Sequence, residues 1–400
     1  MSHMSPMSHM SPMSRLLRDS SLPAVVAGFV AVLVGFTSSV PLVFAAAQAV
    51  GADVAQTASW IWALGLGMAL TSIGLSLRYR QPVLTAWSTP GAALVAATSG
   101  IDLPHAVGAF IACSALIALA GATGLFERLM SRIPQAIAAA LLAGVLARFG
   151  LDAAGAVATA PVLVGVMVLT FLAGRRFVPR YAVPLTLLVG TAVAAAQGAM
   201  DWQRLGGAWA APVWTAPAFS LQALIGLALP LFIVTMASQN LPGVAAQRAA
   251  GYDTPVSPPL VATGLTGVLL APFGGYAFNL AAITAAICMG REAGDDPARR
   301  YTAAVAAGLF YGLAGLAGGA VVGLLQAFPR ELVLAVAGLA LLGTIASGLA
   351  TALKDEPHRD AAALTFLVTL SGVSMLGIGS AFWGVVAGTI ALLVQQWRAR

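Results

Sequence analysis

Residues 82–94 have the sequence Pro-Val-Leu-Thr-Ala-Trp-Ser-Thr-Pro-Gly-Ala-Ala-Leu, and no charged residue lies between Arg80 and Asp102. The first part of this segment is rich in β-branched and aromatic residues, which favour extended structure. The part that follows is typical of a helix start. Thr89 can act as the N-cap, and Pro90 suits the first helical position because its missing N–H has no intrahelical partner to lose. The segment therefore predicts a membrane span that begins extended and continues as a half-helix.

The composition places this segment in a membrane protein. Of the 400 residues, 59% are hydrophobic and only 8% are charged, whereas a soluble domain carries roughly 25% charged residues. Charged residues cluster between apolar stretches of about 17 to 25 residues, enough to cross a hydrocarbon core about 30 Å thick. The predicted class is an all-α polytopic membrane protein. We place about fourteen spans at 22–48, 56–77, 82–100, 104–126, 133–149, 156–174, 181–199, 217–241, 257–271, 273–290, 301–325, 331–352, 360–377 and 380–397.

The distribution of basic residues predicts the orientation. With a cytoplasmic N-terminus, seventeen of the 20 Lys and Arg residues fall in cytoplasmic segments and three, Arg148, Arg204 and Arg330, fall outside. This bias is the one expected for cytoplasmic loops. It predicts a multi-pass protein of the bacterial-type inner (plasma) membrane with both termini in the cytoplasm. Residues 1–14 repeat a Met-Ser-His pattern and are interpreted as a disordered leader or a fusion scar, while 15–400 form a single transporter unit.

An odd number of spans in each half predicts two repeats of opposite orientation. The segment that ends at Asp53 matches the segment that ends at Asp253 if one residue is inserted. The third and tenth spans align without gaps, which places Thr89 on Asn279. The tenth span also contains a segment of low helix propensity, Gly-Gly-Tyr-Ala-Phe at 274–278. Asn279, which follows this segment, is a good N-cap for a half-helix.

Two broken helices that meet near the bilayer midplane predict a binding site. Irregular backbone at that depth is tolerated only where protein or a water-filled cavity satisfies its polar groups. Two helix N-termini bring free N–H donors and positive dipole ends together, which suits an anionic group such as a carboxylate. The alternative is that both spans are simply kinked helices.

Four motifs resemble those of the benzoate/proton symporter family (BenE-like), itself similar in architecture to nucleobase and sulfate transporters with a seven-plus-seven inverted repeat. They are Thr-Ser-Ser-Val-Pro at 37–41, Ala-Trp-Ser-Thr-Pro-Gly at 86–91, Ser-Gln-Asn-Leu-Pro-Gly at 238–243 and Gly-Gly-Tyr-Ala-Phe-Asn at 274–279. The resemblance implies a core domain, approximately 15–127 and 217–325, and a gate domain, approximately 128–216 and 326–400. It also implies a substrate held between spans 1, 3, 8 and 10, an aromatic carboxylate as that substrate, proton coupling and a homodimer.

The sequence departs from the related nucleobase carriers at one point. Those carriers place a glutamate on the eighth or tenth span, where this chain has Gln239, Asn240 and Asn279. Every acidic residue falls in or beside a predicted loop and no histidine lies in the predicted core, so a carboxylate relay for protons has no obvious members. We expect instead that the substrate brings its own proton and crosses as the neutral acid, because burying an unpaired charge is expensive.

The candidate substrate contacts follow from the broken spans. Ser88, Thr89 and Asn279 lie near the half-helix starts, although they could serve only as caps. Gln239 and Asn240 are amides in an apolar span, which predicts a role in the site or between helices. The remaining candidates are Thr37 and Ser38 as weaker polar contacts, Trp87, Tyr276 and Phe278 as walls for a ring or as simple packing, and Gly91 for close backbone approach.

These features predict a secondary active transporter that imports benzoate or a similar aromatic carboxylate, with a proton, by alternating access. The alternative is a transporter of nucleobases or of another organic or inorganic anion. An enzyme is disfavoured because intramembrane catalysis needs acids, nucleophiles or metal ligands at depth, and a channel because broken inverted repeats suit alternating access. We expect no cofactor, no metal and no nucleic-acid partner; the expected partners are the carboxylate, protons, membrane lipid and a second copy of the chain.

Overall fold

The computed structural model describes residues 12–124, 135–204, 209–373, 375 and 380–398. The first half of the chain contains the helices α1 (Pro12–Asp19), α2 (Leu22–Ala49), α3 (Val54–Tyr79), α4 (Thr89–Ala96), α5 (Leu103–Ala122), α7 (Gln135–Thr159), α8 (Pro161–Phe177) and α9 (Ala182–Ala196), with one strand, β1 (Thr85–Trp87). Of the predicted leader at 1–14, only residues 12–14 lie in the described part, where they begin α1.

The second half begins with a helix of mixed geometry. It contains α10 (Leu221–Ala223), α11 (Leu229–Thr235) and α12 (Leu241–Ala249), joined by the π-helical turns η4 (Leu224–Ala228) and η5 (Met236–Asn240). The remaining elements are α13 (Ser257–Leu270), β2 (Phe278–Leu280), α14 (Ile283–Met289), α15 (Tyr301–Leu316), α16 (Gly318–Ala327), α17 (Arg330–Lys354), α18 (Arg359–Ser371) and α19 (Ser380–Arg398).

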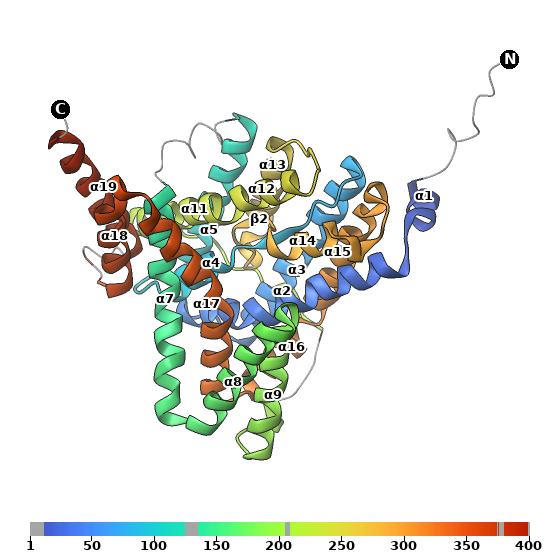
Figure 1. Ribbon diagram of the computed structural model, residues 1–400, viewed down its shortest axis with the longest axis horizontal. Helices are drawn as coiled ribbons and strands as arrows, with labels where there is room; N and C mark the ends of the chain where they lie inside the picture. Colours follow the sequence, from blue (N-terminus) through green and yellow to red (C-terminus); the bar gives the residue numbers. More distant parts are fainter. Residues whose placement is uncertain (1–11, 125–134, 205–208, 374, 376–379, 399–400) are drawn as a thin grey trace.

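The helices pack in two groups (Figure 1). In the first group α3 packs against α15, α5 against α13, and α2 against α4 and α15. In the second group α7 packs along α17, α18 packs against α7 and α19, and α8 packs against α9. Helices α8 and α9 of this second group lie at the bottom of the view. Helix α2 also contacts α17 and α9, so it lies where the two groups meet.

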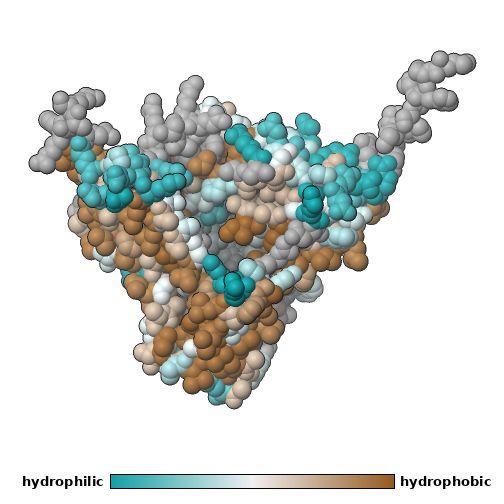
Figure 2. All heavy atoms as spheres, in the orientation of Figure 1, coloured by the Kyte–Doolittle hydropathy of each residue, from teal (hydrophilic) through white to brown (hydrophobic). Residues whose placement is uncertain are grey.

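The helical membrane architecture is confirmed. Five described helices are long and apolar enough to cross a membrane, and the number rises to seven if each of two bent pairs counts as one span. Figure 2 shows hydrophobic residues over most of one face, with hydrophilic residues gathered toward its upper edge. The count of fourteen spans stays a prediction, because elements such as α4 and α14 are only 8 and 7 residues long.

One predicted boundary is wrong. The spans placed at 133–149 and 156–174 assumed a break near Gly150, but α7 continues without interruption to Thr159 and the break comes at Ala160. The physical reason is Pro161, which lacks the N–H that a continuing helix needs and instead starts α8. Arg148 consequently lies inside α7 and not in a loop.

The two strands form an antiparallel ribbon that joins the two halves of the chain. Its register pairs Thr85 with Leu280, Ala86 with Asn279 and Trp87 with Phe278. The ungapped alignment of Thr89 with Asn279 is therefore wrong, because Asn279 lies opposite Ala86 at the centre of the ribbon. Two residues separate β2 from α14, whereas a single residue separates β1 from α4.

The helix caps also differ from the predicted ones. The N-cap of α4 is Ser88, whose Oγ accepts a hydrogen bond of 3.0 Å from the N–H of Gly91, while Thr89 is the first helical residue. Asn279 does not cap α14, which begins at Ile283. Adjacent hydroxyl residues have almost the same capping preference, so the sequence did not distinguish Ser88 from Thr89.

The matching ends of α2 and α12 need no inserted residue. Both helices are followed by a glycine with positive φ, Gly51 at 80° and Gly251 at 84°. In both, the residue after this glycine donates its N–H to the carbonyl five positions earlier. Such closures satisfy carbonyls that a helix end leaves free.

Side chains from neighbouring helices complete the hydrogen bonding of the ribbon. The outward N–H of Thr85 donates to Ser72 Oγ on α3 at 3.0 Å. The N–H of Leu280, directly opposite, donates to Asn240 Oδ1 at 2.9 Å. These bonds matter because an unpaired backbone group buried away from water is costly. Asn240 thus joins the π-helical turn η5 to the strand β2, and its predicted role in the site stays a prediction.

Ser72→Ala is expected to lower the stability of the protein in detergent by about 1–3 kcal/mol, because it leaves the buried N–H of Thr85 without this partner. The measurement is the shift in thermal unfolding temperature. Ser20→Ala is the matched control, since the Ser20 hydroxyl is exposed and donates only to a carbonyl of its own helix. Equal shifts in the two variants would contradict the role given to Ser72.

Candidate binding site

A cavity of about 270 Å³ lies beside the ribbon, where α2, β1, α4, η5, α14, α15 and α17 meet. Its size is close to the lower end of the range for small-molecule sites. None of its described lining residues is charged. They are Val34, Gly35, Ser39, Met68, Ala86, Trp87, Thr89, Ser238, Gln239, Pro242, Ala281, Ala282, Ile283, Thr284, Tyr311 and Ser347.

Trp87 forms a fixed aromatic wall of this cavity. Its Nε1 donates a hydrogen bond of 3.0 Å to Ser39 Oγ, and the Ser39 hydroxyl in turn donates to the carbonyl of Gly35 at 2.6 Å. The edge of the Phe36 ring packs against Trp87 with 5.0 Å between ring centroids. Because both the polar atom and the ring of Trp87 are held, the indole offers a flat surface suited to an aromatic ligand.

Thr89 and Gln239 supply polar groups that are free to bind a ligand. Both line the cavity, and neither side chain hydrogen-bonds to another residue in the described part of the chain. Thr89 is the first residue of α4, near the helix end where partial positive charge gathers. Gln239 lies in the π-helical turn η5, a geometry that often occurs at functional sites. A hydroxyl and an amide together can donate up to three hydrogen bonds to a carboxylate.

Ser88 lies behind the cavity wall and not in it. Its side chain is fully buried, and its Oγ accepts hydrogen bonds from Gly91 N–H and from Thr235 Oγ1, each 3.0 Å long. Gly91 allows the close approach that the sequence predicted: a Cβ at this position would lie 2.6 Å from Leu231 Cδ1. These two residues therefore fix the start of α4 against α11.

Asn279 lies next to the cavity without lining it. Its partner in the ribbon, Ala86, lines the cavity. Asn279 Nδ2 donates to the carbonyl of Ala277 at 3.2 Å, while Oδ1 is buried without a partner among the described residues. Asn240 is fully buried and bonded to β2, as described above.

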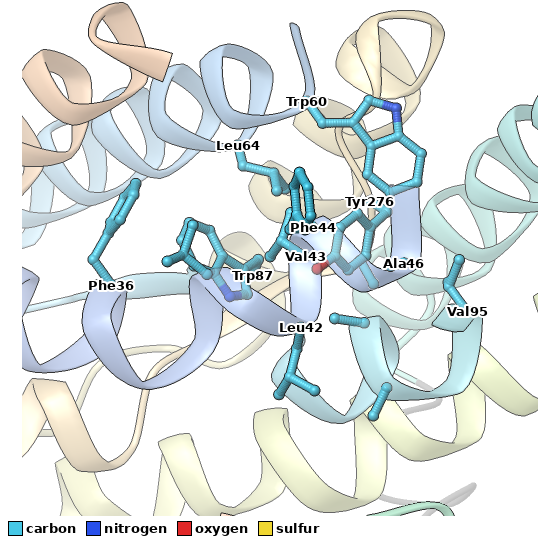
Figure 3. Packing of buried hydrophobic residues seen from close by; sticks show 14 of the residues in the cluster. Phe36, Leu42, Val43, Phe44, Ala46, Trp60, Leu64, Trp87, Val95 and Tyr276 are labelled. Atoms are coloured by element: carbon cyan, nitrogen blue, oxygen red, sulfur yellow. The ribbon is translucent and has the colours of Figure 1, made fainter. Parts of the chain in front are cut away.

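Tyr276 and Phe278 pack away from the cavity. The Tyr276 ring lies 5.8 Å from Trp60 and 5.5 Å from Phe110, and Figure 3 shows Tyr276 next to Trp60 and apart from Trp87. Phe278 fills the space beside Gly67 of α3, where an added Cβ would approach its ring closer than 3.0 Å. Thr37 and Ser38 belong to α2, but their side chains lie outside the described part of the structure.

Five polar lining residues were not among the predicted contacts: Ser39, Ser238, Thr284, Tyr311 and Ser347. Ser39 and Ser238 are direct neighbours of predicted contacts in the sequence. Thr284 of α14 and Tyr311 of α15 both approach Gly35 of α2, where an added Cβ would lie 3.2 Å from Thr284 Cγ2 and 3.2 Å from the Tyr311 hydroxyl oxygen. Tyr311 is an isolated tyrosine in an apolar helix, and its phenol could have been recognised because a buried hydroxyl usually needs a partner.

A second cavity of about 350 Å³ adjoins the first. It is lined by the N-terminal part of α7 from Gln135, by η5 and α12, and by α17 as far as Thr351. Ser238, Pro242 and Ser347 line both cavities. The second cavity therefore extends from the site toward the N-terminal end of α7.

No group of three or more His, Cys, Asp or Glu side chains that could hold a metal occurs in the part of the chain that the structure describes. Asp19 is the buried acid in this part. It lies at the end of α1, pairs with Arg80 at 2.7 Å and accepts a hydrogen bond from the Tyr301 hydroxyl.

The sequence profile of the BenE family, described as benzoate membrane transport protein, matches residues 18–394. The chain belongs to the BenE family. The resemblance found in the four motifs is thus confirmed. Its BenE relatives include the inner membrane protein YdcO of Escherichia coli, 49% identical over 93% of this chain and 95% of that protein. They also include the benzoate membrane transport protein of Acinetobacter baylyi, 43% identical over 95% of this chain and 96% of that protein.

Solved structures share the fold of this BenE family member. The chain resembles SLC26A9 with a TM-score of 0.65 at 14% identity, over 95% of this chain and 66% of that one. It also resembles the transmembrane domain of the cyanobacterial bicarbonate transporter BicA, with a TM-score of 0.55 at 14% identity, over 92% of this chain and 97% of that one. At this identity the likeness concerns the fold alone. The BenE family places the protein among membrane transporters and not among enzymes.

Proposed function

We propose that this protein is a secondary active transporter that imports benzoate or a similar aromatic carboxylate, together with a proton, by alternating access. The observation that carries the proposal is the cavity beside the ribbon. It combines the fixed indole of Trp87 with the unpaired hydroxyl of Thr89 and the unpaired amide of Gln239. An aromatic ring can stack on the Trp87 indole, while its carboxylate accepts hydrogen bonds from Thr89 and Gln239. The name of the Acinetobacter relative supports the same substrate.

The architecture we propose for this transport has fourteen spans in two inverted repeats. The core domain comprises approximately residues 15–127 and 217–325, and the gate domain approximately 128–216 and 326–400. The two packing groups of helices support this division, and the matching ends of α2 and α12 support the repeat. The termini lie in the cytoplasm of a bacterial-type cell, and two copies form a dimer within the lipid.

The proton travels with the substrate in this proposal. The absence of charge from the described lining residues supports it, because no side chain there can exchange a proton near neutral pH. The bound carboxylate is stabilised as an anion by hydrogen bonds, whereas the neutral acid crosses the apolar region at lower cost. Core and gate then move relative to each other around the loaded site, and the neighbouring cavity toward Gln135 and Thr351 is the exit to the cytoplasm.

The proposal predicts that an inward proton gradient drives uptake of labelled benzoate into proteoliposomes without net charge movement. Uptake is measured with and without the gradient, and a potential-sensitive dye reports charge. Uracil and bicarbonate are the competing substrates, and each should fail to inhibit benzoate uptake. Benzoate uptake that moves net negative charge would contradict the shared proton. If the protein takes up uracil or bicarbonate but not benzoate, the assignment of an aromatic carboxylate as substrate is overturned.

A further inference from the structure

Arg148 lies in an unusual place for a cation. It is inside the 25-residue apolar helix α7, about 20 Å along the helix from Gln135 at 1.5 Å per residue. Its side chain is exposed, and it makes no hydrogen bond or ion pair with any residue that the structure describes. An arginine at such depth is costly in lipid, and such residues usually face a water-filled path or a substrate route.

The guanidinium of Arg148 lines a small polar cavity between the two packing groups. One side of the cavity is formed by the end of α4, including Thr98, and the other by α7, α18 and α19. Thr369 of α18 also lines it; this side chain is only 5% exposed, and its Oγ1 lies buried beside Gly384 of α19 without a hydrogen-bond partner among the described residues. An added Cβ on Gly372 would approach Arg148 closer than 3.0 Å, so the guanidinium lies directly against the end of α18.

This cavity is too small to hold a substrate in the structure. Its volume is about 20 Å³, enough for roughly one water molecule and too small for an aromatic acid. The C-terminal end of α4 carries partial negative charge, and this end faces the same cavity as Arg148. Separation of α4 from α7 would therefore leave an arginine and a free hydroxyl at the opening.

We propose that Arg148 and Thr369 form a capture site that binds the carboxylate of an incoming aromatic acid before it reaches the central cavity. This inference rests on the proposed function and on the proposed orientation, in which the Gln135 end of α7 is cytoplasmic. Arginine binds carboxylates through two parallel hydrogen bonds and keeps its charge at all working pH values. In the structure the carbonyl end of α4 occupies the position that the substrate carboxylate takes when the site opens.

The test compares Arg148→Gln and Arg148→Lys with the control Arg204→Gln, which removes the same charge from an exposed loop arginine paired with Asp201. Initial rates of benzoate uptake are measured in right-side-out vesicles and in inside-out vesicles. We expect Arg148→Gln to raise the KM from the outer side about ten- to a hundredfold, the range for a lost hydrogen bond to a charged group. The kcat and the KM from the inner side should remain within about twofold.

Arg148→Lys should retain part of the outer affinity, because it keeps the charge but loses the paired geometry. Arg204→Gln should leave both KM values unchanged. An equal rise of KM on both sides, or a loss of kcat at constant KM, would overturn the capture site and make Arg148 a structural residue. An absence of benzoate uptake by the unaltered protein would overturn the proposed function itself, so the two failures are distinguishable.

Discussion

Gln239→Leu is expected to lower the kcat/KM of benzoate uptake by about ten- to a hundredfold, which corresponds to the loss of a hydrogen bond to a charged group worth about 1.5–3 kcal/mol. The effect should be this large because the Gln239 amide lines the cavity and has no other described partner. Leucine removes the amide donors and replaces the polar side chain by an apolar one of roughly similar volume. The measurement is the initial rate of uptake into proteoliposomes across a range of benzoate concentrations.

Thr89→Val provides a second arm of the same experiment. It replaces a hydroxyl by a methyl group of almost equal volume, and we expect a loss of similar size. If both residues bind one carboxylate, the double variant should lose less than the product of the two single losses, because residues that share a partner are not additive. Gln197→Leu, at an exposed helix end, is the control. Normal uptake by Gln239→Leu would show that the Gln239 amide does not bind the substrate.

Gly274→Ala is expected to destabilise the protein by about 3 kcal/mol or more. Gly274 has a φ of 96°, and an added Cβ would approach the Trp60 indole closer than 3.0 Å. Trp60 is only 2% exposed and packs against Phe110 and Tyr276, so it has little room to move. The left-handed conformation costs about 1–2 kcal/mol for a residue with a Cβ, and overpacking adds about 1–3 kcal/mol.

Gly251→Ala separates these two contributions. Gly251 has a similar φ of 84°, but no atom lies within 4 Å of its added Cβ. It should therefore show the conformational cost alone. Thermal unfolding in detergent and the monodisperse fraction after purification give the comparison. Equal losses in the two variants would show that the Trp60 cluster tolerates the extra atom.

The sequence predicted the region of the site better than its details. The low helix propensity around Trp87 and the polar pair at 239–240 both indicated the place where the cavity lies. Thr89, Trp87 and Gln239 line it. Asn279 was misplaced by three residues relative to the first half because an ungapped alignment of Ala-rich segments cannot detect a difference in spacing: six residues separate Pro272 from Asn279, whereas three separate Pro82 from Ala86.

Other features depended on contacts that no local pattern contains. Tyr276 and Phe278 had the same local features as Trp87, yet their side chains pack against α3 and α5. Trp87 and Phe278 are paired in the ribbon, yet only Trp87 lines the cavity, so the packing of neighbouring helices decides which aromatic residue faces it. Arg148 was placed at the outer end of the predicted span 133–149, whereas the helix continues past it as far as Thr159.

The ribbon has a consequence for the synthesis of the protein. Asn279 follows its partner Ala86 by 193 residues along the chain. At about 5–20 residues per second, the ribosome needs roughly 10–40 s to deliver the second strand after the first. During that interval the first strand sits in the membrane with its inner edge unpaired, which favours water or an insertion factor beside it. The nascent chain therefore has to be sheltered until both halves are present.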